Sequence, residues 1–241
     1  MARRLIAAAV LVGVLAAPAA ARERAPKLTI FAAASLTGAF QAFDSSETYS
    51  FAGSNTLAAQ IRQGARADVF ASASPRYTQD LFRAGLVEKP VTFATNRLVL
   101  IVPRSNPAGL SSVYDLGRKN VKLVVAAPAV PVGSYTRTVL RRLGLSSVLT
   151  KVVSQESDVK GVVGKVVLGQ ADAGFVYVTD VKPVARDVAS IRIPAWAQPR
   201  LRYEIAVVRS SSQKTAARAW VARIRGKAGR AALARAGFGQ P

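Results

Sequence analysis

Apolar-rich runs of five to nine residues alternate with stretches of helical pattern along most of the chain. Runs of this length are typical of strands, and a helical pattern follows most of them. This order predicts an α/β fold with mainly parallel sheets, in which ligands bind beyond the carboxyl ends of the strands. The predicted strands are 28–34, 49–53, 67–73, 97–103, 121–128, 173–178 and 201–209.

The predicted helices begin where these strands end. The first strand ends in small residues and runs directly into Ser35, which opens a helix with an apolar stripe. Asp158 is the natural N-cap of a later helix. Two further helices are predicted over 214–229 and 230–238. The other expected helix starts lie near Ser54, Pro75 and Gly133.

Two segments are predicted to cross between two lobes, namely 96–99 and 198–203. After the first crossing a new run of strands begins, and after the second the chain returns through an apolar strand to the C-terminal helices. This organisation predicts lobe I from 28–96 plus 204–241 and lobe II from 97–203. Each lobe is expected to be a mainly parallel sheet flanked by helices, with the ligand in the cleft between them.

The first 21 residues are predicted to be a cleavable signal peptide. Arg3 and Arg4 precede an apolar run over 5–17, and Ala19–Ala21 offers a small-residue cleavage site. The run is too short to favour a membrane span. The chain contains no Cys, so no lipid anchor can be attached after cleavage. We therefore expect a mature chain that begins near Arg22 and resides in the periplasm.

The composition narrows the possible chemistry of the chain. It has 241 residues, half of them hydrophobic, with neither His nor Cys. Thiolate chemistry and a Ser-His-Asp triad are therefore excluded. The net charge is +21, but the basic residues are dispersed and no RNA-binding aromatic motif or zinc spacing accompanies them. We expect no nucleic-acid partner, and only a general attraction for anions.

An enzyme is the main alternative class of protein. The segment Ser157–Lys160 matches the S-x-x-K motif of penicillin-recognising enzymes, but the companion S-D-N and K-T-G motifs are absent. Lys214-Thr215-Ala216 is only a near match. The sequence also lacks a phosphate-binding G-x-x-x-x-G-K-[ST] loop. We predict a binding protein that is not an enzyme and uses no cofactor.

Four helix starts suggest what this protein binds. They lie at Ser35, at Ser54, at 131–133 and at 157–159. A helix start carries unpaired N–H donors and a partial positive charge. Taken singly, each serine has an ordinary capping role. Several such starts that converge on a cleft would form an anion site without any charged side chain.

A set of motifs sharpens this interpretation. In order along the chain they are FAAASLTGAF, FAGSNTLAAQI, GARADVFASAS, AVPVGSYTRTVL, ESDV and ADAGFVYVTDV. The set resembles the periplasmic molybdate-binding proteins of ABC importers, a family of type II periplasmic solute-binding proteins, over essentially the whole mature chain. The resemblance implies a two-lobed periplasmic-binding-protein fold and a monomer. It also implies that the ligand is molybdate or tungstate, delivered to an inner-membrane importer permease.

The resemblance also implies the ligand contacts. Ser35 and Ser54 would each donate a hydroxyl and a main-chain N–H, Val132 and Val159 would each donate a main-chain N–H, and Tyr177 would donate its phenol O–H. No residue would ligate a metal cation, because the molybdenum is held as an oxyanion. Another tetrahedral oxyanion such as sulfate, or a small organic anion, stays open as the alternative ligand.

One departure from the family pattern concerns the first two contacts. Ser54 lies only 19 positions after Ser35, an interval shorter than is usual for relatives. We expect a truncated first helix and a brief second strand in this interval.

Overall fold

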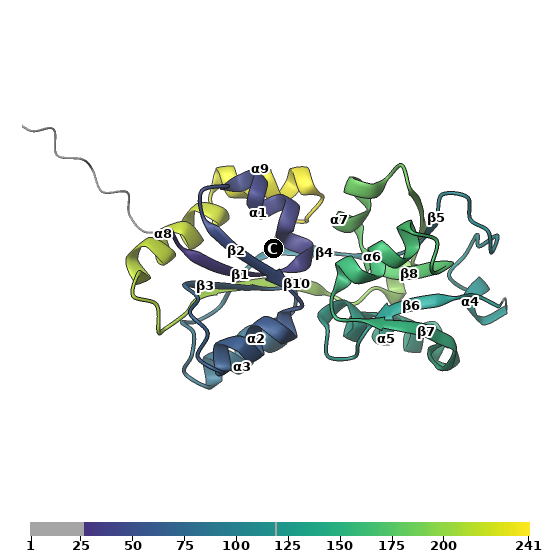
Figure 1. Ribbon diagram of the computed structural model, residues 1–241, viewed down its shortest axis with the longest axis horizontal. Helices are drawn as coiled ribbons and strands as arrows, with labels where there is room; N and C mark the ends of the chain where they lie inside the picture. Colours follow the sequence, from purple (N-terminus) through teal and green to yellow (C-terminus); the bar gives the residue numbers. More distant parts are fainter. Residues whose placement is uncertain (1–26, 119) are drawn as a thin grey trace, which may run out of the picture.

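The computed structural model describes residues 27–118 and 120–241 of the chain. The predicted signal peptide, 1–21, and its cleavage site lie outside these residues. Within the described part, two five-stranded sheets lie one after the other along the long axis of the molecule (Figure 1). We call the first sheet with its helices lobe I, and the second sheet with its helices lobe II. The predicted two-lobed α/β fold is confirmed.

Lobe I contains a sheet of strand order β2-β1-β3-β10-β4. Strand β1 pairs in parallel with β2 and β3, whereas β10 runs antiparallel to both β3 and β4. The sheet is therefore mixed, not mainly parallel as expected, because β10 enters from the other lobe. Its strands are β1 (Thr29–Ala33), β2 (Thr48–Ala52), β3 (Val69–Ser72), β4 (Val91–Asn96) and β10 (Leu201–Val207).

Lobe II repeats this pattern with the strand order β7-β6-β8-β5-β9. Strand β6 pairs in parallel with β7 and β8, and β5 is antiparallel to β8 and β9. Here the antiparallel strand is again one that enters from the other lobe. The strands are β5 (Leu98–Pro103), β6 (Leu123–Ala126), β7 (Val152–Glu156), β8 (Ala173–Tyr177) and β9 (Val188–Arg192).

Helices cover both faces of the lobe I sheet (Figure 1). On one face lie α1 with α8 and α9, where Trp220 of α8 packs edge-on against Phe40 of α1. On the other face Leu57 of α2 and Leu81 of α3 join a separate apolar cluster. The helices of this lobe are α1 (Thr37–Phe43), α2 (Ser54–Arg62), α3 (Pro75–Arg83), α8 (Lys214–Arg225) and α9 (Lys227–Ala236).

The helices of lobe II likewise follow its strands. The start of α5 follows β6, α6 follows β7 and α7 follows β8 directly. The described helices of this lobe are α4 (Asp115–Arg118), α5 (Pro131–Arg142), α6 (Val159–Val167) and α7 (Val178–Val181). None of the helices over 27–118 and 120–241 combines the length and the apolar character that a membrane span needs.

The larger apolar core runs through both lobes without a break. At the junction, the ring of Tyr177 in β8 meets the ring of Tyr203 in β10, with 5.8 Å between their centroids. Tyr203 also contacts Phe93 and Phe238 edge-on. Aromatic side chains therefore join the cores of the two lobes behind the strand ends.

The chain passes between the lobes twice. A single residue, Arg97, separates β4 from β5, and the residues after β9 lead into β10. The first residue of β10, Leu201, already pairs with Asn96 in the lobe I sheet. The predicted boundary between 203 and 204 therefore falls inside β10.

Two sequence predictions need correction in detail. The segment at Ser35 first forms a short 3-10 helix, η1 (Ala34–Leu36), and α1 starts only at Thr37. The break between the last two helices lies at Gly226, not between 229 and 230. Gly229 lies so close to the end of α8 that an added Cβ would stand 2.0 Å from the carbonyl oxygen of Ile224. The close crossing of α8 and α9 thus needs a glycine inside α9.

Candidate functional site

A small cavity lies between the two lobes, and all five sequence-predicted residues line it: Ser35, Ser54, Val132, Val159 and Tyr177. The rest of the lining is alanine, glycine, valine and proline, apart from Asp158. The space open to the centre of a water-sized sphere is about 20 Å³. A single water needs roughly 10–15 Å³ on the same measure. The cavity therefore suits a compact guest of a few heavy atoms.

The convergence of these five residues follows from strand direction. Ser35 follows β1, Ser54 follows β2, and Tyr177 is the last residue of β8. Val132 and Val159 lie at the starts of α5 and α6, which follow β6 and β7. The carboxyl ends of parallel strands meet at one edge of a sheet. In the two sheets, the ends of the strands face each other across the junction of the lobes (Figure 1).

Ser54 is the first residue of α2, and its hydroxyl is already engaged as an acceptor. The backbone N–H of Ala73, which follows β3, donates to Ser54 Oγ at 3.0 Å. The Ser54 side chain is buried and makes no capping bond to its own helix. Because a hydroxyl carries a single proton, that proton remains available to an acceptor in the cavity.

Gly53 allows the start of α2 to approach lobe II closely. A Cβ at this position would stand 2.6 Å from the carbonyl oxygen of Ser157. The rim of the cavity also has a direct bond between the lobes, since the Tyr77 hydroxyl of α3 donates to the carbonyl oxygen of Ala129. The two lobes are therefore in direct contact next to the cavity.

The start of α5 is held tightly against the end of β6. A Cβ on Gly133 would stand 2.1 Å from the carbonyl oxygen of Ala127, so only glycine allows this approach. Pro131 occupies the first helical position and has no N–H. The first N–H donor of the helix therefore belongs to Val132. Its position is fixed by backbone packing and not by its side chain.

Asp158 caps the start of α6 but does not accept the backbone N–H of Val159. Its Oδ1 accepts the N–H groups of Lys160 and Gly161 at 2.7 and 3.1 Å. The first N–H groups of a helix lack intrahelical partners, and the cap does not engage that of Val159. The predicted role of Asp158 as N-cap is thus confirmed.

Tyr177 brings the one phenol of the cavity lining. It is 1% exposed, and its hydroxyl has no hydrogen-bond partner among residues 27–118 and 120–241. Burial raises the pKa of Tyr177 well above its ordinary value, so the hydroxyl keeps its proton and can donate. A buried polar group left without a partner costs about 1–3 kcal/mol, which a ligand oxygen at this hydroxyl would recover.

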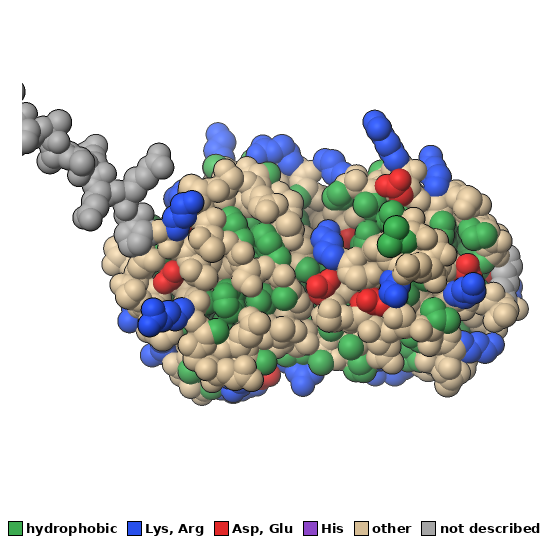
Figure 2. Space-filling model, in the orientation of Figure 1, with side chains coloured by type: hydrophobic (Ala, Val, Ile, Leu, Met, Phe, Trp, Pro, Cys, Tyr) green, Lys and Arg blue, Asp and Glu red, His purple; other side chains and the backbone are tan. Residues whose placement is uncertain are grey.

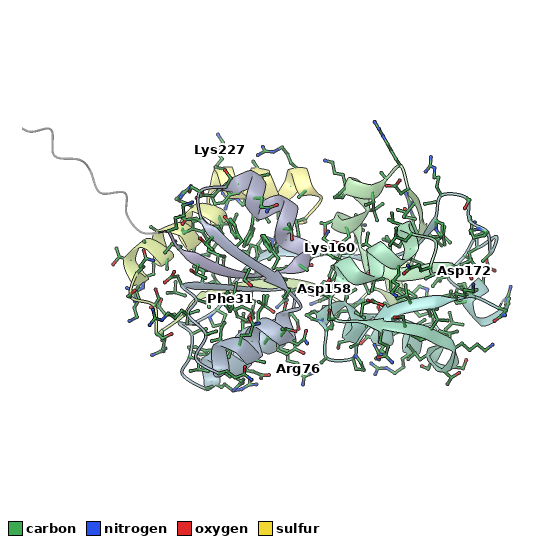
Figure 3. All side chains as sticks on the ribbon, in the orientation of Figure 1. Phe31, Arg76, Asp158, Lys160, Asp172 and Lys227 are labelled. Atoms are coloured by element: carbon green, nitrogen blue, oxygen red, sulfur yellow. The ribbon has the colours of Figure 1, made fainter. Side chains whose placement is uncertain are left out.

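An ion pair between an exposed lysine and a buried aspartate lies beside the cavity. Lys160 Nζ donates to Asp180 Oδ1 at 2.8 Å, and the Asp180 side chain is fully buried. Burial raises the pKa of Asp180, and the nearby Lys160 ammonium opposes that shift. Figure 3 places Asp158 and Lys160 on the side of lobe II that faces lobe I. Lys160 is thus paired with a carboxylate instead of pointing its charge into the cavity.

The positive charge of the chain is not concentrated at this site. No Lys or Arg lines the cavity within the described part of the chain. Figure 2 shows Lys and Arg side chains mostly around the outline of the molecule. Dipoles of helix starts and hydroxyl groups therefore make up the donor set, and such a set suits a compact anion with several acceptor oxygens.

The site offers little to other kinds of chemistry. Among residues 27–118 and 120–241 no group of three Asp or Glu side chains could hold a metal ion. The S-x-x-K segment supplies the helix cap and the Lys160 ion pair, so its residues have structural roles. Among the described residues that line the cavity, no nucleophile is paired with a base, so this set of donors suits ligand binding.

Two residues behind the cavity were not predicted from the sequence. Tyr203 of β10 contacts Ser35, with 2.9 Å between Oη and Oγ, and Asn96 at the end of β4 donates to Tyr203. Tyr203 was predicted only as part of a crossing strand. The one sequence signal was that Asn96 is a polar residue between two apolar runs at the predicted crossing.

Comparisons with known proteins agree with this fold. The family model of the bacterial extracellular solute-binding proteins matches residues 28–239. The molybdate-binding protein ModA of Mycobacterium tuberculosis is 40% identical over 234 residues, covering 93% of this chain and 88% of that protein.

Two solved structures share the fold. The periplasmic molybdate-binding protein of Azotobacter vinelandii superposes with a TM-score of 0.79 at 23% identity, covering 89% of this chain and 100% of that one. The sulfate-binding protein SubI of M. tuberculosis superposes with a TM-score of 0.73 at 17% identity, covering 88% and 86%. These two likenesses are evidence for the fold alone.

Proposed function

The chain belongs to the bacterial extracellular solute-binding proteins, and from this premise we propose that it captures molybdate and delivers it to an ABC importer. The observation that carries the proposal is the convergence of five donor positions on one cavity: Ser35, Ser54, Val132, Val159 and Tyr177. The 40% identity with a molybdate-binding protein over nearly the whole chain supports the same ligand.

The proposed donors surround the ion from both lobes. Ser35 and Ser54 donate hydroxyl and backbone N–H groups from lobe I. Val132 and Val159 donate backbone N–H groups from lobe II, and Tyr177 donates its phenol. A tetrahedral dianion presents four acceptor oxygens and no proton, so each of its oxygens can meet donors only. Hydrogen bonds to a charged partner contribute about 1.5–3 kcal/mol each.

Size and protonation give the proposed selectivity. Phosphate keeps a proton through much of the neutral range, and this proton would face donors in the cavity. The one carboxylate of the lining, Asp158, is committed to the start of α6. Sulfate is smaller than molybdate, and donors fixed on packed helix starts cannot follow a smaller ion inward. Tungstate resembles molybdate in both size and charge, so it should bind as well.

Sulfate is the second candidate ligand, because a sulfate-binding protein shares this fold. The fold by itself does not separate the two ions. An organic anion is less suitable, since a cavity of about 20 Å³ has room for only a few heavy atoms.

The proposal extends to the cellular setting. The mature chain, starting near Arg22, would act as a monomer in the periplasm and dock on the permease of an inner-membrane importer. Mass spectrometry of the exported protein should find a chain that starts near Arg22. An intact Met1 would contradict the export step.

Calorimetric titration of the purified, ligand-free chain tests the function. Molybdate and tungstate should bind tightly at physiological salt, sulfate far more weakly, and phosphate not measurably. A competition experiment completes the test. Sulfate or phosphate that displaces molybdate at equal concentration would overturn the assignment.

A further inference from the structure

The side chain of Asn96 has an orientation that its neighbours determine. Its Oδ1 accepts the backbone N–H of Arg97 at 2.9 Å. A backbone N–H can only donate, so the atom that faces it must be the amide oxygen. The amide nitrogen then faces Tyr203 and Thr179, and it donates to their hydroxyl oxygens at 3.3 and 3.0 Å.

The direction of the next bond follows from this one. The Tyr203 hydroxyl is fully buried, and in the described part of the chain its hydrogen-bond partners are Asn96 and Ser35. The amide nitrogen of Asn96 donates to this oxygen and cannot take its proton, so Ser35 Oγ, 2.9 Å away, is the acceptor left for that proton among these two partners. Burial raises the pKa of Tyr203, so this proton stays in place at neutral pH.

Ser35 is the last residue in this series of hydrogen bonds, which runs from Asn96 through Tyr203. Its oxygen accepts from Tyr203, which leaves its single proton free to point into the cavity. Ser54 has the same arrangement by another route, because the backbone N–H of Ala73 donates to its oxygen. The backbone donor behind Ser54 cannot reverse, whereas the donor behind Ser35 is a side chain and can be changed.

We propose that Asn96 and Tyr203 are positioning residues that make Ser35 a donor to the bound anion. The proposal rests on the proposed function, and it concerns residues behind the cavity that do not touch the ion. Asn96, Tyr203 and Ser35 form what we call the relay. All three belong to lobe I, so the direction of the Ser35 proton is set before lobe II closes on the ligand.

The substitution Asn96→Asp reverses the relay with almost no change of shape. An aspartate accepts from both sides, so Tyr203 would turn its proton toward residue 96. The Tyr203 oxygen would then accept from Ser35, and Ser35 would present lone pairs to the anion. The loss of one charge-assisted hydrogen bond weakens binding by about ten- to a hundredfold.

The added negative charge could by itself repel an anion, and Tyr203→Phe separates the two effects. Without the phenol no reversal can reach Ser35, whose proton still donates to the ligand. Tyr203→Phe should therefore weaken binding by less than about fivefold, well under the loss of a charge-assisted bond. In the Tyr203→Phe background, Asn96→Asp should add less than about threefold, because the relay no longer transmits the change.

The experiment titrates molybdate, tungstate and sulfate into the full exported chain and into these variants by calorimetry. Tyr49→Phe is the matched control, since it removes a lobe I phenol that donates to the carbonyl of Asp44 and lies outside the relay. Its affinity should equal that of wild type. Thermal unfolding of each ligand-free variant checks that it is folded.

The outcomes are distinguishable. If Asn96→Asp binds molybdate with wild-type affinity, the relay is wrong. The relay is also wrong if Asn96→Asp reduces the affinity equally in the wild-type and the Tyr203→Phe backgrounds. If the wild-type protein binds sulfate most tightly, the proposed ligand is wrong. The affinities of the Asn96 and Tyr203 variants would then be compared with sulfate as the ligand. Binding of none of the three ions would overturn the proposed function, and the relay with it.

A second double-mutant comparison, of Ser35→Ala with Tyr203→Phe, covers the case in which Asn96→Asp fails to fold. Tyr203 acts on the ligand only through Ser35, so Tyr203→Phe should have no further effect on affinity in a Ser35→Ala background. Independent, multiplicative losses from Ser35→Ala and Tyr203→Phe would contradict the relay.

Discussion

The two lobes share a sheet pattern but contribute donors of different kinds. In both sheets the second strand, β1 or β6, pairs in parallel with its two neighbours, and the next strand after these three is an antiparallel one that enters from the other lobe. Lobe I places serine hydroxyls at its two helix starts, and protein donors contact each hydroxyl oxygen from behind. Lobe II places valines at its two helix starts, so its donors there are backbone N–H groups.

This difference determines how each lobe can be altered. A backbone N–H cannot be removed by changing a side chain, and its position depends on packing such as that of Gly133 against Ala127. A hydroxyl can be removed, and its proton can point in a wrong direction unless a partner sets it. We infer that lobe I carries most of the side-chain sensitivity of binding, and lobe II most of its geometric rigidity.

The largest expected effect tests this asymmetry directly. The double variant Ser35→Ala/Ser54→Ala should weaken molybdate binding by about 10²- to 10⁴-fold, because two charge-assisted bonds are lost. The matched lobe II variant Val132→Ala/Val159→Ala keeps both N–H groups and should lose less than about tenfold. Calorimetry on the two variants measures both. Equal losses would remove the distinction between the lobes.

Tyr177 is the exception in lobe II, and its substitution sharpens the comparison. Tyr177→Phe should weaken binding by about ten- to a hundredfold. The ligand-free variant should be at least as stable as wild type, because the removed hydroxyl has no partner in the described structure. Titration and thermal unfolding are to be measured together. A destabilised variant with unchanged affinity would show a structural role instead.

The ion pair between Lys160 and the buried Asp180 gives the stability of lobe II a dependence on pH. Burial raises the pKa of Asp180, so the charged carboxylate costs the folded state stability at neutral pH, and this cost disappears as the pH falls through the folded-state pKa. Lys160→Met removes the group that lowers this pKa. The variant should melt a few degrees below wild type at pH 7.5, and the difference should shrink toward pH 4. A difference that is constant with pH would exclude this cause.

The smallest expected effect concerns the motion of one lobe against the other. The lobes are joined at Arg97 and through the residues between β9 and β10, and such a connection permits hinge bending. Small-angle scattering should give a smaller radius of gyration with molybdate than without. Identical profiles at saturating molybdate would show a preformed pocket, and the lobes would then act as one body.

The strands that the sequence missed share a physical property. Fully buried strands such as β3, β5 and β8 are continuous apolar runs, and all were predicted. The three missed strands, β4, β7 and β9, lie at the edges of the sheets. Edge strands such as β7 alternate between half-buried and exposed residues. Their apolar signal is therefore too weak to separate them from loops.

The structure within the short interval between Ser35 and Ser54 was also predicted from the sequence. A seven-residue α1 and a five-residue β2 fit between Ser35 and Ser54, as expected for a truncated helix and a brief strand. The start of α2 at Ser54 and the cap of α6 by Asp158 were predicted because both depend on neighbouring residues only.

By itself, the sequence determined the α/β class and most of the helix starts, which follow from local rules of periodicity and capping. The five residues that line one cavity were identified by the resemblance of the sequence motifs to a known family. Only the tertiary structure decided where the hydroxyl protons point. The bond between Ser35 and Tyr203 joins residues 168 positions apart, and that between Asn96 and Tyr203 spans 107. A hydroxyl turns freely until a partner is brought to it, and in this protein the packing of distant strands brings the partner.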